Sequence, residues 1–209
     1  MSTRNNNRKT KILIFILFKS RCEASFNVRD EKGRMIRQWQ RSGIQRAIFA
    51  IVCGGLVAGI LDIAYAIAVY APRHPILIPQ AIATGILGTK SYRMGIESAA
   101  LGIVLHFTIA LSATAVFYLV SLRAEVLTNR PLLSGMVYGA CVYFFMHYVV
   151  LPLSAAPTYH HPLPETLCEF VEHLVFVGLP ISLSVRNSLN SGRPREARDL
   201  SGFPNGAAR

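Results

Sequence analysis

Charged residues are scarce in this chain of 209 residues, and they are unevenly placed. Only 16% of the residues are Asp, Glu, Lys or Arg, whereas 52% are hydrophobic. Residues 1–46 hold 12 of the 22 Lys and Arg and 3 of the 11 acids, so this segment carries about +9 of the net charge of +11. Beyond Ala47, long stretches contain no Lys or Arg. Apolar stretches joined by charged loops are typical of a membrane protein with several spans.

Other absences exclude further classes of protein. No two cysteines form a CxxC pair or lie close together, so a disulfide framework and a zinc ribbon are both unsupported. The four cysteines are Cys22, Cys53, Cys141 and Cys168. The basic residues flank apolar stretches and form no stripe on a soluble face, so we expect them to contact anionic lipid headgroups and no nucleic acid. No nucleophile–base pair or phosphate-binding loop is visible, which disfavours an enzyme.

Four stretches are apolar and long enough to cross a hydrocarbon core of about 30 Å at 1.5 Å per residue. They are residues 47–71, 98–122, 132–154 and 166–185. Pro180 predicts a bend or break in the fourth span. The apolar part of residues 75–95 is too short to span, so it predicts an interfacial or re-entrant helix. The expected fold is therefore all-α, an integral membrane bundle of about four transmembrane helices plus this short helix.

The segments on either side of the transmembrane domain, residues 47–186, differ from it in composition. Residues 1–46 form a basic N-terminal extension, and its end, Arg34–Arg46, reads as a juxtamembrane helix anchored at the interface by Trp39. The apolar run ILIFILF within this extension is too short to span, although it leaves a signal-peptide reading open. Residues 187–209 are rich in Ser, Gly, Pro and Arg and predict a disordered tail.

The Lys and Arg counts predict the orientation. With four spans, the N-terminal extension, the loop with Arg123 and Arg130, and the C-terminal tail share one side of the membrane, which we expect to be the cytoplasm. The loop with His160 and His161 then faces the outside. The segment with Arg73, Lys90 and Arg93 also falls outside and is the exception to this scheme.

Ionisable residues within the spans are the main candidates for function, because each costs about 2.5–3.5 kcal/mol at the centre of a helix. Counting residues from the outer end of each span places most of them roughly 6–13 Å below the outer boundary at the rise of an α-helix. Four helices thus bring them into one slab, where we expect them to form a proton- or metal-binding cluster. Its members are Asp62, His106, His147, Glu169, Glu172 and His173.

Within this slab, His147, Glu169 and His173 are expected to lie closest together, with Asp62 beside them. These three are the tentative metal ligands, since carboxylates and imidazoles suit a divalent transition metal. Glu172 lies one turn from Glu169 but is rotated from it, and could face a neighbouring helix.

Small residues predict where the helices approach one another. Gly55 and Gly59 share a face of the first span with Asp62, and Gly135 and Gly139 repeat the same spacing in the third span. The GxxxG pattern lets helix backbones pack closely within a membrane.

The third and fourth spans carry Gly135-x3-Gly139, His147, the segment VVLPLSAAP, and Glu169-x3-His173 followed by Leu-Val-Phe. This pattern, over about residues 131–187, resembles the YagU-like family of small bacterial inner-membrane proteins. The resemblance implies a multi-pass protein of the bacterial inner membrane whose biochemistry is unassigned, and it points to His147, Pro152, Glu169 and His173. It supplies no substrate.

These observations favour a membrane protein with a polar site that binds protons or a divalent metal in the outer half of the bundle. Two alternatives remain open. One is a structural or accessory subunit, in a homo-oligomer or beside a partner membrane subunit, whose polar cluster only locks the helices together. The other is a b-type haem protein with His106 and His147 as the axial ligands.

The predicted topology can be tested by labelling single cysteines in a variant that lacks the native four. A cysteine at position 160 should react with a membrane-impermeant reagent from the outside, and one at position 190 only from the cytoplasm, because a single span separates this loop from the C-terminal tail. Labelling of both positions from the same side would contradict the four-span arrangement.

Overall fold

The computed structural model describes residues 43–157 and 162–191. The chain divides into two units, Met1–Gln45 and Arg46–Arg209. Of the first unit only Gly43–Gln45 is described, and the packing below is that of the second. The predicted N-terminal extension up to residue 42, the His160–His161 loop and the tail from residue 192 lie outside the described residues.

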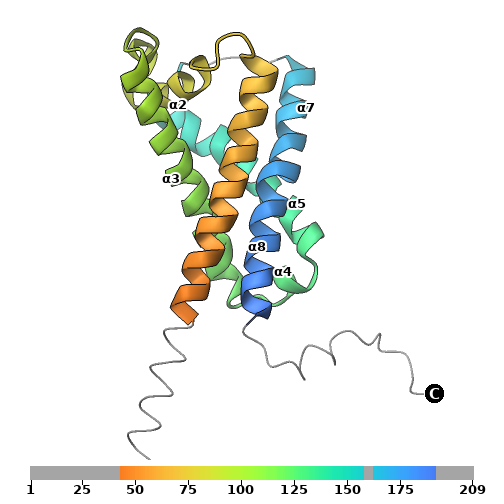
Figure 1. Cartoon of the computed structure of the whole chain (residues 1–209). Coiled ribbons are helices and arrows are strands. Elements are labelled where there is room, and N and C mark those ends of the chain that lie inside the picture. Colours follow the sequence, from red (N-terminus) through yellow and green to blue (C-terminus); the bar gives the residue numbers. More distant parts are fainter. Residues whose placement is uncertain (1–42, 158–161, 192–209) are drawn as a thin grey trace, which may run out of the picture. The chain divides into compact units, whose positions relative to one another are not determined.

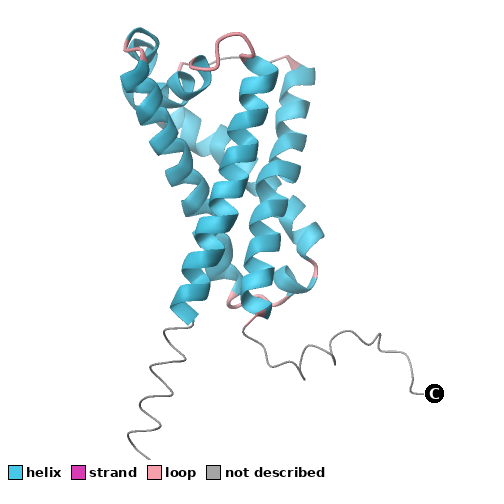
Figure 2. Ribbon diagram, in the orientation of Figure 1, coloured by secondary structure: helices cyan, strands magenta, loops and turns pink. Residues whose placement is uncertain are grey.

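The described residues form helices joined by short loops and turns, and they contain no strand (Figure 2). Four helical stretches have the length and hydropathy to cross a membrane, which confirms the predicted fold class. They are Gly43–Tyr70, Ile96–Ser121, Pro131–Leu153 and Leu163–Asn190. Each lies within a few residues of its predicted range. The fourth is longer than predicted at both ends and stays helical through Pro180.

The third and fourth spans are each built of three consecutive elements. The third consists of α5 (Pro131–Phe145), the π-helical turn η2 (Met146–Val150) and the short α6 (Leu151–Leu153). The fourth consists of α7 (Leu163–Glu172), the π-helical turn η3 (His173–Gly178) and α8 (Leu179–Asn190). The short α4 (Val126–Asn129) lies in the connection between α3 (Ile96–Ser121) and α5. Both spans therefore stay helical through a widened turn.

The first span lies between α3 and the fourth span (Figure 1). A Cβ atom at Gly54 would lie 3.0 Å from Thr114 on α3 and 3.1 Å from Ser184 on α8, so this glycine touches both neighbours. At Gly55 it would lie 2.8 Å from Leu111, and at Gly59 2.9 Å from Phe107. The first span thus presents its glycines to α3, as the GxxxG pattern predicts.

Hydroxyl groups join the spans, because the hydrocarbon core offers no water to satisfy them. Ser188 donates to the carbonyl of Arg46 at 2.7 Å, and Ser184 donates to the carbonyl of Ala50 at 3.1 Å. The start of the first span and the end of the last therefore meet at one end of the bundle. Ser182 likewise donates to Pro131 at 2.9 Å, and this bond joins α8 to α5.

The short predicted helix is α2 (Leu77–Leu87), followed by the 3₁₀ turn η1 (Gly88–Arg93). Its 11 residues cover only about 16 Å, too little to span. A Cβ at Gly102 of α3 would clash with the carbonyl of Pro79, so α2 packs directly on the α3 backbone. At its other end, the amide of Ala155 donates to Gly85 at 2.9 Å. The helix therefore crosses one end of the bundle, from α3 to the end of the third span. This end of the bundle is called the α2 end below, and the opposite end is called the α4 end.

A network of buried hydrogen bonds joins α2 and η1 to the start of α3. The hydroxyl of Ser91 donates to the Gln80 carbonyl at 2.7 Å, and that of Ser98 donates to the Ser91 carbonyl at 2.7 Å. The Gln80 amide donates to Gly95 at 2.9 Å. Because Gln80, Ser91 and Ser98 are almost wholly buried, these bonds hold α2 and η1 against α3.

A second close helix contact joins α5 to η3. A Cβ atom at Gly139 would clash with the carbonyl of His173 and lie 2.8 Å from the Cα of Leu174, and one at Gly178 would clash with the carbonyl of Gly135. Gly139→Ala should therefore lower the free energy of unfolding by about 1–3 kcal/mol, through overpacking against backbone that cannot move aside. Unfolding in mixed micelles measures this change.

Gly85→Ala in α2 is the matched control, since its new methyl group would meet nothing nearer than Ser154 at 3.8 Å. This substitution should be neutral or stabilising, because alanine favours a helix over glycine by about 1 kcal/mol. Equal effects of the two substitutions would show that the α5–η3 approach is not as close as described.

Candidate functional site

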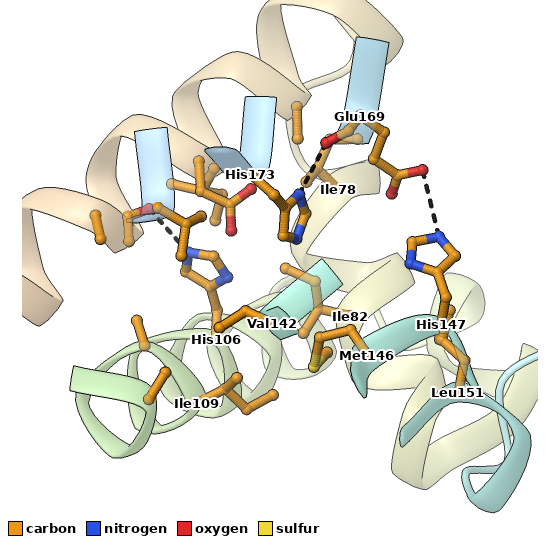
Figure 3. A pocket seen from close by; sticks show the side chains of 18 residues that line it. Ile78, Ile82, His106, Ile109, Val142, Met146, His147, Leu151, Glu169 and His173 are labelled. Atoms are coloured by element: carbon orange, nitrogen blue, oxygen red, sulfur yellow. Dashed lines mark hydrogen bonds and ion pairs between the residues drawn. The ribbon is translucent and has the colours of Figure 1, made fainter. Parts of the chain in front are cut away.

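One cavity of about 240 Å³ collects five of the six predicted site residues from four different helical stretches. They are Asp62, His106, His147, Glu169 and His173. Figure 3 shows His173 between His106 and His147, with Glu169 above His147. The sixth residue, Glu172, does not line the cavity and contacts His173. The structure therefore brings these five side chains around one cavity, while their depth in a membrane and a ligand or role for them stay predictions.

His147 and Glu169 form the more exposed pair, with side chains 24% and 28% accessible. The Nδ1 atom of His147 lies 3.1 Å from the carbonyl oxygen of Tyr143, which can only accept, so Nδ1 carries a hydrogen. The Nε2 atom lies 3.4 Å from Oε2 of Glu169. Without a proton between them, a nitrogen lone pair would face a carboxylate oxygen, so this contact is favourable only when the pair holds that proton.

His173 and Glu172 form the second pair, which is buried. The Nδ1 atom of His173 lies 2.7 Å from Oε2 of Glu172 and 3.0 Å from the carbonyl of Glu169. Both oxygens accept, so Nδ1 is again the protonated nitrogen, and Nε2 is left without a hydrogen bond among the described residues. The other carboxylate oxygen of Glu172, Oε1, is fully buried and has no hydrogen-bond partner there. A buried carboxylate with one partner is costly unless it is neutralised, so His173 and Glu172 depend on each other.

His106 is held by the first span. Its Nε2 atom donates to the carbonyl of Gly59 at 2.8 Å, which leaves Nδ1 as the proton-accepting nitrogen of the neutral ring. The side chain is buried, and its ring packs edge-on against Phe107. All three histidines thus have one ring nitrogen fixed by a backbone carbonyl and the other left for the site.

Asp62 completes the cluster. It lies within electrostatic range of four ionisable side chains: Glu172, His106, His173 and Glu169. A carboxylate inside a membrane needs such surroundings, because pairing with imidazoles offsets its insertion cost.

Two π-helical turns place His147 and His173. Each turn ends two residues before a proline, at Val150 before Pro152 and at Gly178 before Pro180. Proline has no amide hydrogen, and its ring clashes with the carbonyl four residues earlier, so a widened turn upstream accommodates it. Tyr143 packs between the two histidines, with ring centroids 4.1 Å from His147 and 5.4 Å from His173. Pro180 thus widens the fourth span where a bend or break was predicted.

The geometry does not favour a metal site. Within residues 43–157 and 162–191, no group of three His, Cys, Asp or Glu side chains is arranged to hold a metal ion. Of the three predicted ligands, His147 contacts Glu169, whereas His173 holds Glu172 and the backbone carbonyl of Glu169 through Nδ1. The donor types remain suitable for a divalent metal, but their observed arrangement is that of two separate histidine–carboxylate pairs.

A haem held by His106 and His147 fits less well. The Nε2 atoms of both rings already contact Gly59 and Glu169, respectively. The cavity is also smaller than the roughly 300–1,000 Å³ of ordinary small-molecule pockets.

Several residues of the site were not predicted. Ile78 and Ile82 of α2 line the cavity, and Pro79 packs on Gly102, one turn nearer than His106 to the α2 end of α3. The short helix therefore borders the cavity. Tyr143 could have been predicted from the sequence, because it lies four residues before His147, and residues four apart are neighbours on a helix.

Comparison of the chain with family models, curated proteins and solved structures gives no significant match. The resemblance to the YagU-like family therefore stays a prediction that rests on the motifs of the third and fourth spans.

The pairing of His147 with Glu169 can be tested by a double-mutant cycle of His147→Gln and Glu169→Gln. We expect the two effects on the free energy of unfolding to be non-additive by about 0.6–1.7 kcal/mol, the range found for polar contacts within membranes. Tyr148→Phe provides the control with Glu169→Gln, because Tyr148 adjoins His147 in the chain and is 74% exposed. Additivity of the first pair would contradict the contact.

Proposed function

We propose that this multi-span membrane protein binds and exchanges protons in the cavity between its four spans. The observation that carries the proposal is the pairing of imidazoles with carboxylates, His147 with Glu169 and His173 with Glu172. Each pair places a nitrogen opposite a carboxylate oxygen, an arrangement that depends on an intervening proton. Chains of Asp, Glu and His are the usual means of handling protons inside membranes.

The distribution of these groups supports a site reached from one side of the membrane. Towards the α4 end, the spans contain no Asp, Glu, His, Lys or Arg in residues 47–61, 107–122, 131–146 and 174–185. The buried polar groups there are hydroxyls such as Thr114, which donates to its own helix at the Ala110 carbonyl. A site of this kind suits proton binding or sensing better than an open path across the membrane.

The charge pattern of the sequence supports an outward-facing site. The α4 end carries Arg46, Arg123, Arg130 and Arg186, so it belongs to the cytoplasm by the positive-inside rule. The N- and C-termini would then be cytoplasmic, and the cavity would lie in the outer half of a bacterial inner membrane, as the YagU-like resemblance implies. Protons would reach it from outside through the partly exposed pair of His147 and Glu169.

A structural role is the second candidate, and the contact of His106 with Gly59 favours it. That bond joins α3 to the first span at 2.8 Å and resembles the hydroxyl-to-carbonyl bonds elsewhere in the bundle. If all three histidines served only to lock helices, their rings would keep one protonation state over the physiological range.

Magnetic resonance of ¹⁵N-labelled histidine in liposomes separates these readings. At about pH 8, where an unperturbed imidazole is neutral, His106 should carry its hydrogen on Nε2, and His147 and His173 on Nδ1. On acidification to about pH 4, at least two of these rings should change protonation. Single His→Gln variants assign the signals, and His74 is the solvent-exposed reference. Three unchanging rings would favour the structural role.

A further inference from the structure

A second hollow, of about 570 Å³, adjoins the cavity and opens between α3 and α5. It is lined almost entirely by apolar side chains and is called the α3–α5 groove below. Its walls include Thr108, Ser112 and Val116 of α3, and Cys141 and Phe145 of α5, all exposed on the outer surface of the bundle. In a membrane this surface faces lipid, so the groove is reached from the hydrocarbon core.

The groove and the cavity share part of their walls. Four residues line both: Ile109, Ala113, Val142 and Met146. Ala113 has a small side chain, and the unbranched side chain of Met146 can change its conformation to fit a neighbouring group. At the α4 side of the opening, the Tyr138 hydroxyl donates to the Ala113 carbonyl at 2.6 Å and ties α5 to α3. The lipid-facing groove and the cavity with the three histidines therefore adjoin at this shared wall, which includes the flexible side chain of Met146.

We propose that the two hollows together bind a neutral, lipid-soluble molecule with a compact oxygen-bearing ring and an apolar tail, the chemistry of a prenylated quinone or quinol. The tail lies in the α3–α5 groove, and the ring lies in the cavity. The proposal concerns binding alone, and it rests on the proposed function because the same imidazoles and carboxylates would contact the ring oxygens.

The size and charge of the cavity select this class of head group. Its 240 Å³ admits a single ring but is small for a larger ligand. Asp62 and Glu169 in its wall disfavour an anionic phosphate. The cavity also lies within the hydrophobic spans, where a charged lipid headgroup is costly, so a phospholipid would leave its headgroup at the interface and the cavity empty.

The fixed tautomers provide the polar contacts. On the neutral rings, Nδ1 of His106 and Nε2 of His173 accept hydrogen bonds, so they suit the hydroxyl of a quinol. After protonation of the rings, the same two atoms donate hydrogen bonds and suit the carbonyl of a quinone. The site can therefore hold either form of such a ring.

Retention of tritiated decylubiquinone by the protein in phosphatidylcholine nanodiscs tests the proposal, with empty nanodiscs as the blank. Ser112→Phe and Cys141→Phe fill the groove from its exposed side and should weaken binding at least tenfold. Ala100→Phe is the matched control, since Ala100 is exposed on the same helix and lines neither hollow. Excess decanol, which has a tail but no ring, should not displace the quinone.

Retention no greater than in empty nanodiscs, full displacement by decanol, or wild-type binding by both groove variants would each overturn the proposal. The histidine resonances of Ser112→Phe distinguish this failure from failure of proton binding. If they titrate as in the wild type while the quinone is not retained, the proton site stands and only the quinone is excluded.

Discussion

The site depends on the contact between the backbones of α5 and η3. Because Gly139 has no side chain, the carbonyl of His173 can approach it, and because Gly178 has none, the carbonyl of Gly135 can do the same. This approach brings the third and fourth spans together where Tyr143 packs against both His147 and His173. Lipid tails are as apolar as the helices, so close packing of this kind, rather than the hydrophobic effect, holds spans together.

The two prolines act on the same pair of spans. A proline within a membrane helix frees a carbonyl upstream, and each freed polar group must find a partner. In the third span, the imidazole of His147 donates to the carbonyl four residues earlier, on Tyr143. In the fourth span, His173 does the same with Glu169. These two carbonyls lie nine and eleven residues before Pro152 and Pro180, so the histidine bonds fix the imidazole tautomers, while the π-helical turns that follow accommodate the prolines.

The spans and the depth of the ionisable groups could be predicted from the sequence, because hydropathy and the helical rise are local properties. The partners of each group could not. A π-helical turn adds a residue and rotates the helix that follows it, so faces counted at 3.6 residues per turn fail beyond His147 and His173. Glu172 lies just before the π-helical turn of the fourth span and pairs with its neighbour His173, a contact that the helical count does not predict. The position of α2 across the end of the bundle depends on Pro79 and Gly102, which lie far apart in the sequence.

The confinement of ionisable groups to one half of the bundle follows from the cost of burying them. Serine and threonine hydroxyls are satisfied by a single carbonyl, so they serve as helix contacts anywhere along the spans, as Ser184 and Ser188 do. A carboxylate needs a cationic or protonated partner, and Glu172 has only one oxygen satisfied. In the described residues, the buried polar side chains of the opposite half are hydroxyls, so the site that we propose for protons would exchange them towards the α2 end only.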